Sequence, residues 1–186
     1  MSLNLTTLDD FLPKQEFNQI YNNIPFLEWK ADDYHIEGID HIWYSNGPLI
    51  PQDFSVFEKA LKEKFKKKII SCSLNSWTWV NTKEPIPHID YVKDKCEYQL
   101  IVYIRSDEKI NGGTAFYRQD ETGYEIDINV GFKENRAILF KSKDCLHSPL
   151  LWNAKSPVGR YSAIFQLVVE DVQNDNRWQF FIGRSM

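Results

Sequence analysis

The segment YEIDINV at positions 124–130 alternates large apolar residues with polar ones, and this alternation favours a β-strand. Further runs rich in β-forming residues occupy positions 98–105, 136–141 and 159–169. No helical pattern separates these runs, so they predict a sandwich or barrel such as a jelly roll. The tripeptide Asn111-Gly112-Gly113 is in addition a strong hairpin signal.

Helical periodicity is confined to the amino-terminal part of the chain. An apolar stripe predicts a first helix at about 13–23, where Pro13 suits a first helical turn. A second stripe recurs every three or four residues, and Ser55 and Glu58 have the spacing of a capping box. The members of this second stripe are Phe54, Phe57, Leu61, Phe65 and Ile69.

The whole chain therefore predicts a single, mostly β domain over 1–186. We expect a helical support region at 1–70, a jelly-roll core at 71–170 and a C-terminal extension at 171–186. The polar, acidic amino terminus is unlike an export signal, and no long apolar run predicts a membrane span.

The composition narrows the class of partner. With 22 basic and 26 acidic residues, the formal net charge of −4 gives no pull toward nucleic acid or anionic lipid. A lysine cluster at 62–68 interleaves with the second apolar stripe, which favours a solvated helix face. Three irregularly spaced cysteines build neither a disulfide framework nor a zinc site, which favours a reducing cytoplasm. We expect a peptide or small-molecule partner.

His88 and Asp90 form a His-x-Asp pair that could chelate a metal. Residues two apart on a strand share a face, and Pro85 and Pro87 favour an extended backbone at this point. Alone the pair is weak evidence, because four histidines and 14 aspartates give about 0.3 such pairs by chance. Its alternative reading is an ordinary surface polar pair.

Two features downstream strengthen the metal hypothesis. His147 follows a predicted strand, and two imidazoles with one carboxylate are what a non-haem Fe(II) oxygenase needs. Arg160 and Ser162 stand two apart on the last predicted strand, so both would face inward with Ile164 and Gln166. A buried arginine is costly unless it meets a carboxylate. The sequence supplies no obvious partner, which leaves room for an acidic cosubstrate.

The order of these elements resembles the 2-oxoglutarate- and Fe(II)-dependent dioxygenases of the prolyl-4-hydroxylase-like branch. The resemblance covers about 71–170, and the lead-in at 8–12 is also similar. The matching elements are His88-Ile89-Asp90, 98–104, Gly112-Gly113-Thr114-Ala115-Phe116, 135–140, His147 and Gly159-Arg160-Tyr161-Ser162.

The resemblance implies a double-stranded β-helix in which His88, Asp90 and His147 ligate iron. It implies that Arg160 and Ser162 bind the distal carboxylate of 2-oxoglutarate and that the Tyr103 phenol reaches the same group, although Tyr103 also reads as an ordinary strand aromatic. The implied reaction consumes O2, yields succinate and CO2 and hydroxylates a peptidyl or small-molecule substrate, with ascorbate as a reductant.

The sequence departs from the prolyl hydroxylases proper in ways that put a prolyl substrate in doubt. They often carry lysine where Arg160 stands, usually closer to the last histidine than Arg160 lies to His147. The Gly112-Gly113 element also lacks the acidic residue often found after it. A non-enzymatic, cupin-like module that binds a metal or a small acid is the alternative function, and a structural or interaction domain is a third.

A few other residues admit a functional reading that we do not favour. Cys145 would share a face with His147, but a small buried apolar group is the commoner role of such a thiol. Trp77 and Trp79 could line a substrate mouth, yet core packing is commoner. The residues expected to lie in loops or at the surface are His35, His41, Arg118 and Arg136.

Overall fold

The computed structural model describes seven segments of the chain: 5–31, 41–45, 51–81, 87–90, 97–106, 113–150 and 160–171. At 30–31, 41–45, 51–53 and 73–81 it describes the backbone alone. The helical elements are α1 (Lys14–Asn23), η1 (Ile24–Phe26), α2 (Pro51–Ala60), η2 (Leu61–Phe65) and η3 (Ser142–Asp144). The strands are β1 (Leu5–Leu8), β2 (Lys30–Ala31), β3 (His41–Ser45), β4 (Lys67–Asn81), β5 (Tyr98–Ser106), β6 (Gly113–Asp120), β7 (Gly123–Gly131), β8 (Ala137–Lys141), β9 (His147–Pro149) and β10 (Arg160–Asp171).

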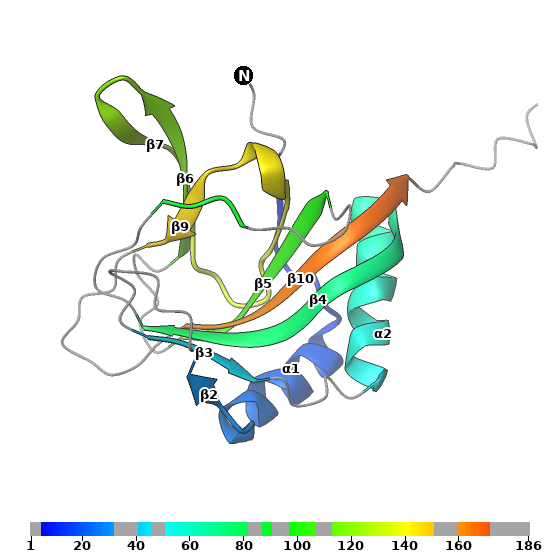
Figure 1. Cartoon of the computed structure of the whole chain (residues 1–186). Coiled ribbons are helices and arrows are strands. Elements are labelled where there is room, and N and C mark those ends of the chain that lie inside the picture. The colour runs from blue at the N-terminus through cyan, green and yellow to red at the C-terminus, as the bar shows by residue number, and fades with distance from the viewer. Residues whose placement is uncertain are drawn as a thin grey trace, which may run out of the picture.

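These strands form two antiparallel sheets, which confirms the mostly β prediction (Figure 1). The larger sheet has seven strands in the order β1-β8-β5-β10-β4-β3-β2, and the smaller has three in the order β7-β6-β9. Strands predicted at 98–105, 124–130, 136–141 and 159–169 are all present as β5, β7, β8 and β10. The sequence did not predict β1, β2 and β3, which extend the larger sheet at both edges.

The two faces of the larger sheet bury different apolar clusters. On β10, Ala163, Phe165 and Leu167 join the cluster formed with α1 and α2, which lie together on one side of the sheet (Figure 1). Ile164 points the other way, toward a second cluster shared with the smaller sheet. The alternation predicted for this strand therefore separates a helix-covered face from the interior between the sheets. No helix in the described segments is long and apolar enough to cross a membrane.

The predicted first helix is confirmed as α1, but the second helix differs from the prediction at both ends. It begins at Pro51, so Ser55 and Glu58 do not form a capping box at its start. The helical stretch continues from α2 through η2 and ends at Phe65, because Lys66 takes a left-handed conformation with φ of 57°. Ile69 therefore belongs to β4, and its helical spacing is coincidental, as its β-branched side chain suits a strand.

The predicted hairpin at Asn111-Gly112-Gly113 is also wrong as a pairing signal. Positions 111 and 112 lie outside the described residues, but the flanking strands β5 and β6 belong to different sheets. The glycine at 113 serves a close approach instead, since an added Cβ would lie 2.1 Å from the carbonyl oxygen of Val130. The backbone of β6 can reach β7 here only without a side chain.

Candidate metal centre

Backbone pairing brings the His-x-Asp segment against β9. The amide of His88 donates to the carbonyl of His147 at 2.9 Å, and the amide of His147 donates back to His88 at 2.9 Å. Directly opposed residues of such a pair share a face. The two imidazole rings accordingly lie 4.8 Å apart.

Asp90 completes the cluster from the same face as His88. Its Oδ1 lies 3.6 Å from His88 Nε2, and its Oδ2 lies 3.3 Å from His147 Nε2. The three ligand atoms all lie within 4.8 Å of one another. Asp90 and His147, which are far apart in the sequence, thus meet in the single site that the sequence predicted.

The hydrogen bond at the far side of the His147 ring prepares it for a metal. Nδ1 lies 3.0 Å from the carbonyl oxygen of Cys145, which can only accept, so the ring carries its proton there. In the neutral ring Nε2 presents a lone pair toward the Asp90 carboxylate, so either a second ring proton or a metal ion must lie between these two acceptors. A carbonyl behind the ring is the usual support of a metal-binding histidine.

The electrostatics of the cluster keep Asp90 ionised. Burial alone would raise the pKa of Asp90, but the hydrogen bond and charge of His147, the charge of His88 and a hydrogen bond from Gln99 together lower it. A charged carboxylate with two imidazoles fits a divalent first-row metal such as Fe(II), and leaves positions open for other ligands. The residues present therefore fit the ion that the sequence resemblance implied.

Two aromatic rings pack against the inner side of this cluster. Phe116 stacks on His147 with ring centroids 6.0 Å apart, and Phe140 meets it edge-on at 4.9 Å. Cys145 packs in the same apolar cluster, as the favoured reading expected. Burial and the nearby Asp144 charge raise the pKa of its thiol to about 11. The thiol is therefore neutral and packs as an apolar group.

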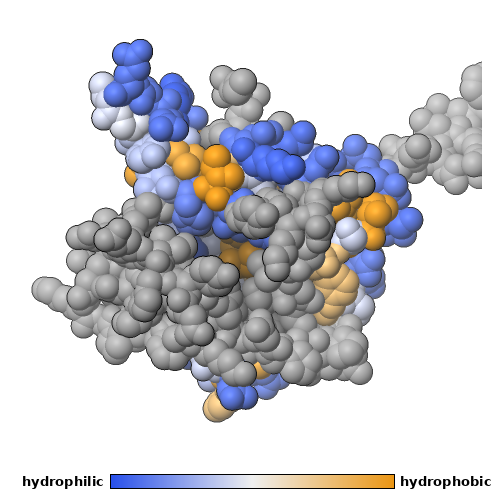
Figure 2. All heavy atoms as spheres, in the orientation of Figure 1, coloured by the Kyte–Doolittle hydropathy of each residue, from blue (hydrophilic) through white to orange (hydrophobic). Residues whose placement is uncertain are grey.

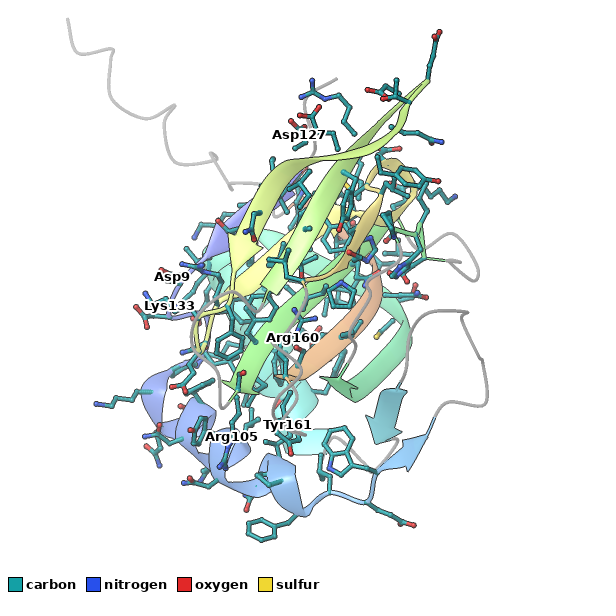
Figure 3. The ribbon with its side chains drawn as sticks, turned by 90° about the vertical axis from the view of Figure 1, so that its left-hand side faces the viewer. Asp9, Arg105, Asp127, Lys133, Arg160 and Tyr161 are labelled. Atoms are coloured by element: carbon teal, nitrogen blue, oxygen red, sulfur yellow. The ribbon has the colours of Figure 1, made fainter. Side chains whose placement is uncertain are left out.

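A buried cation lies at the other end of the same interior. Arg160 is 3% exposed at the start of β10, and its guanidinium lies 4.9 Å from the centre of the Tyr103 ring. One Nη1–H bonds to the carbonyl of Gly113, while Nε has no partner among the described residues. Figure 3 shows Arg160 inside the barrel, with Tyr161 at the end nearer the first helix. Burial lowers the pKa of Arg160, against a smaller opposing effect of Tyr103.

Tyr103 and Ser162 line the surroundings of this arginine, and both are fully buried. The Tyr103 hydroxyl donates to Thr114 Oγ1 at 2.7 Å, and burial raises the Tyr103 pKa. Its phenol could donate to a cosubstrate carboxylate only after leaving Thr114. No described carboxylate lies within ion-pair distance of Arg160, which fits an acidic ligand in the interior.

Sequence reasoning missed Gln99, which is 3% exposed on β5 and hydrogen-bonds to Asp90. Its Oε1 has no partner among the described residues. The sequence did contain a signal for Gln99 as a site residue. Gln99 stands four positions before Tyr103 on the same strand, so both side chains point into the same interior.

The other candidate residues do not join the centre. Arg118 pairs with Asp127, and Arg136 pairs with Asp9, as expected of arginines outside the site. The side chains of Trp77, Trp79 and His41, and all of His35, lie outside the described residues.

No family model matches the chain, and no curated protein is similar to it in sequence. Solved structures do match. A Pseudomonas putida prolyl-4-hydroxylase superposes with a TM-score of 0.54 at 11% identity, covering 89% of this chain and 92% of the other. A Trichoplax adhaerens prolyl hydroxylase, solved with a hypoxia inducible factor peptide, gives a TM-score of 0.61 at 13% identity, covering 89% and 84%. The chain has the fold of the 2-oxoglutarate- and Fe(II)-dependent oxygenases.

The same fold also occurs in an enzyme of small-molecule biosynthesis. The non-haem, alpha-ketoglutarate-dependent epimerase SnoN of nogalamycin biosynthesis gives a TM-score of 0.57 at 12% identity, covering 88% of this chain and 77% of the other. These similarities confirm the predicted double-stranded β-helix with its supporting helices.

Proposed function

We propose that this protein is an Fe(II)- and 2-oxoglutarate-dependent dioxygenase that hydroxylates a peptidyl or small-molecule substrate. The observation that carries the proposal is the pairing of two features in one interior. A His-Asp-His cluster lies at one end of it, and at the other lies a buried arginine with an unpartnered Nε and no described carboxylate beside it. Neither feature alone would distinguish an oxygenase from a metal-binding module.

In the proposed enzyme, His88, Asp90 and His147 hold Fe(II), and Arg160 binds the distal carboxylate of 2-oxoglutarate, with Ser162 and Tyr103 beside it. Bound iron, with 2-oxoglutarate and O2, supplies the oxidising power for the C–H bond. The overall change is R–H + 2-oxoglutarate + O2 → R–OH + succinate + CO2. The Phe116 and Phe140 rings exclude water from the inner side of the centre.

Related folds support both classes of substrate. The Trichoplax enzyme was solved with a peptide, and SnoN acts in the biosynthesis of nogalamycin. The exposed side of the centre is formed by the His88–Asp90 segment, where Ile89 is 51% exposed. A cytoplasmic location and a role for ascorbate stay predictions.

The proposal is tested by succinate formation from 2-oxoglutarate with Fe(II), O2 and ascorbate, together with the stoichiometry of bound Fe(II). His88→Ala and Asp90→Ala are expected to lose iron binding and succinate formation together. Asp171→Ala, which removes a carboxylate that is 80% exposed, is the matched control and should behave as wild type. Stoichiometric iron and 2-oxoglutarate binding without succinate would instead support the binding-module alternative.

A further inference from the structure

The β6–β7 hairpin exposes three large apolar side chains. Tyr124, Ile126 and Ile128 alternate along β7 and are 54%, 50% and 37% exposed. A strand with this alternation ordinarily buries one face. Here the hairpin projects from the barrel, and Figure 2 shows hydrophobic atoms where it joins the body. The predicted strand is present, but Tyr124, Ile126 and Ile128 join neither described core cluster, unlike Val130 at its base.

A shift in register determines which residues share a face of the hairpin. Phe116 pairs with Ile128, whereas the next residue, Tyr117, pairs with Ile126 across a bulge. Gln119 then pairs with Tyr124. Because directly opposed residues share a face, the hairpin end carries Tyr117, Gln119, Tyr124 and Ile126 together. The Tyr117 hydroxyl lies 2.8 Å from Ser148 Oγ, which connects this face to β9.

The hairpin stands at the end of the barrel where Asp90 lies. His88, His147 and Phe116 form one row across three neighbouring strands. The His88 segment and β6 are each antiparallel to β9, so they run in the same direction from that row. Asp90 and the hairpin end therefore lie beyond the row on the same side. A chain added at the free edge of β7 would lie at this same end of the barrel, with β7, β6 and β9 between it and the His88 segment, or about 19 Å at the usual strand spacing.

The free edge and the charge of the hairpin indicate what could bind there. In the described part of the chain β7 pairs with β6 alone, so its other edge can accept an added strand. Segment 118–129 carries four carboxylates and one arginine, and every residue in it is exposed. That arginine, Arg118, is already paired with Asp127. Charges and bulges also protect edges from aggregation, but such protection does not call for exposed Tyr124 and Ile126.

A second copy of this chain fits the hairpin poorly, since two acidic edges would repel each other. Resting on the proposed function, we propose that β7 docks an extended, basic segment of a polypeptide substrate. The segment alternates apolar residues with lysine or arginine and adds as a strand to β7. Its apolar side chains cover Tyr124 and Ile126, and its cations meet the hairpin carboxylates. About six further residues in extended conformation would then bring another part of the same chain to the metal centre.

The test uses the full-length protein, with Fe(II) and 2-oxoglutarate, and a labelled peptide of six Val-Lys repeats. Matched peptides of six Val-Glu repeats and six Pro-Lys repeats reverse the charge or remove the strand donors. Binding is followed by fluorescence anisotropy, and protection of the amides at 123–129 by hydrogen exchange. Ile126→Ser is compared with Ile70→Ser, whose side chain is 53% exposed on β4, away from the hairpin.

We expect the Val-Lys peptide to bind and to protect 123–129, with binding about tenfold weaker in Ile126→Ser and unchanged in Ile70→Ser. No binding, equal binding of either matched peptide, or an equal loss in both variants would overturn the docking proposal. So would a dimer in sedimentation that Ile126→Ser dissociates, because it would assign the edge to a second copy.

Two further measurements link docking to the reaction. A peptide library that places varied residues at up to about eight positions beyond the Val-Lys segment should yield products that gain one oxygen atom, and this gain should fall in Ile126→Ser. Succinate formation without peptide should be equal in wild type and Ile126→Ser. If succinate forms while docking fails, the docking proposal alone is overturned. If docking holds and no succinate forms under any condition, the oxygenase proposal alone is overturned.

Discussion

Replacing Arg160 with methionine should separate binding from stability. Arg160 is buried, its Nε is unpartnered among the described residues, and no described carboxylate neutralises it. Methionine is of similar length, carries no charge and needs no hydrogen bonds. We expect Arg160→Met to make the ligand-free protein more stable and to weaken its binding of 2-oxoglutarate.

The expected magnitudes follow from what the guanidinium contacts. Burying an uncompensated charge costs several kcal/mol, while the bond to Gly113 and the face of Tyr103 return about 2–4 kcal/mol. Removing the charge should raise the free energy of unfolding by about 1 kcal/mol, or about 2–4 °C in Tm. Loss of a two-bond, charge-assisted contact to the cosubstrate costs about 3 kcal/mol, so its Kd should rise by roughly a hundredfold.

Thermal unfolding with and without 2-oxoglutarate, under anaerobic conditions with Fe(II), measures both effects. Arg105→Met is the matched control, because Arg105 lies on the neighbouring strand and covers Tyr21 at 5.1 Å outside the interior (Figure 3). That variant should bind 2-oxoglutarate as wild type does. An Arg160→Met protein that is clearly less stable than wild type, with unchanged 2-oxoglutarate affinity, would show that Arg160 has a purely structural role and refute the reasoning.

Two more predictions concern the partners of charged groups. Gln99→Leu should weaken metal binding by about 10- to 100-fold, because Asp90 loses its hydrogen bond from Gln99. Calorimetry with Mn(II) measures this affinity. Gln166→Leu is the control, at a buried position opposite Gln99 on β10, and should leave metal binding unchanged. Hydrogen bonds from Arg136 and Lys133 lower the pKa of Asp9 to about 2 from 3.8 (Figure 3), so its stabilisation is present above pH 4 and is lost as the pH falls through about 2. Asp9→Asn should therefore cost about 1 kcal/mol or less in urea unfolding at pH 7, since Asp9 is partly exposed, and the difference from wild type should vanish near pH 2; a difference independent of pH would contradict this assignment.

Much of the fold was readable from the sequence because its signals are local. Alternation along β10 predicted which residues face the helices and which face the interior. The i, i+2 spacing of His88 and Asp90 likewise predicted a shared face, and the structure brings His147 to it. In each case the geometry of a single strand is sufficient to place the side chains.

What the sequence could not show depends on pairing between distant segments. Gly113 looked like a turn residue, and only the position of Val130 shows that it is needed for a close approach. Gln99 had no visible partner until Asp90 lay beside it. The exposure of Ile126 was equally hidden, because alternation predicts a strand whether or not another layer covers it.

The strand order of the larger sheet also constrains how the chain can be synthesised and folded. β1 lies at one edge of that sheet beside β8, and Leu5 pairs with Phe140, so the two partners are made early and late in synthesis. At the usual rate of elongation, β1 leaves the ribosome on the order of 10 s before its partner exists. Throughout that interval β1 has no native strand to join. This edge of the larger sheet can therefore be completed only after β8 has been made, however early the rest of the chain begins to fold.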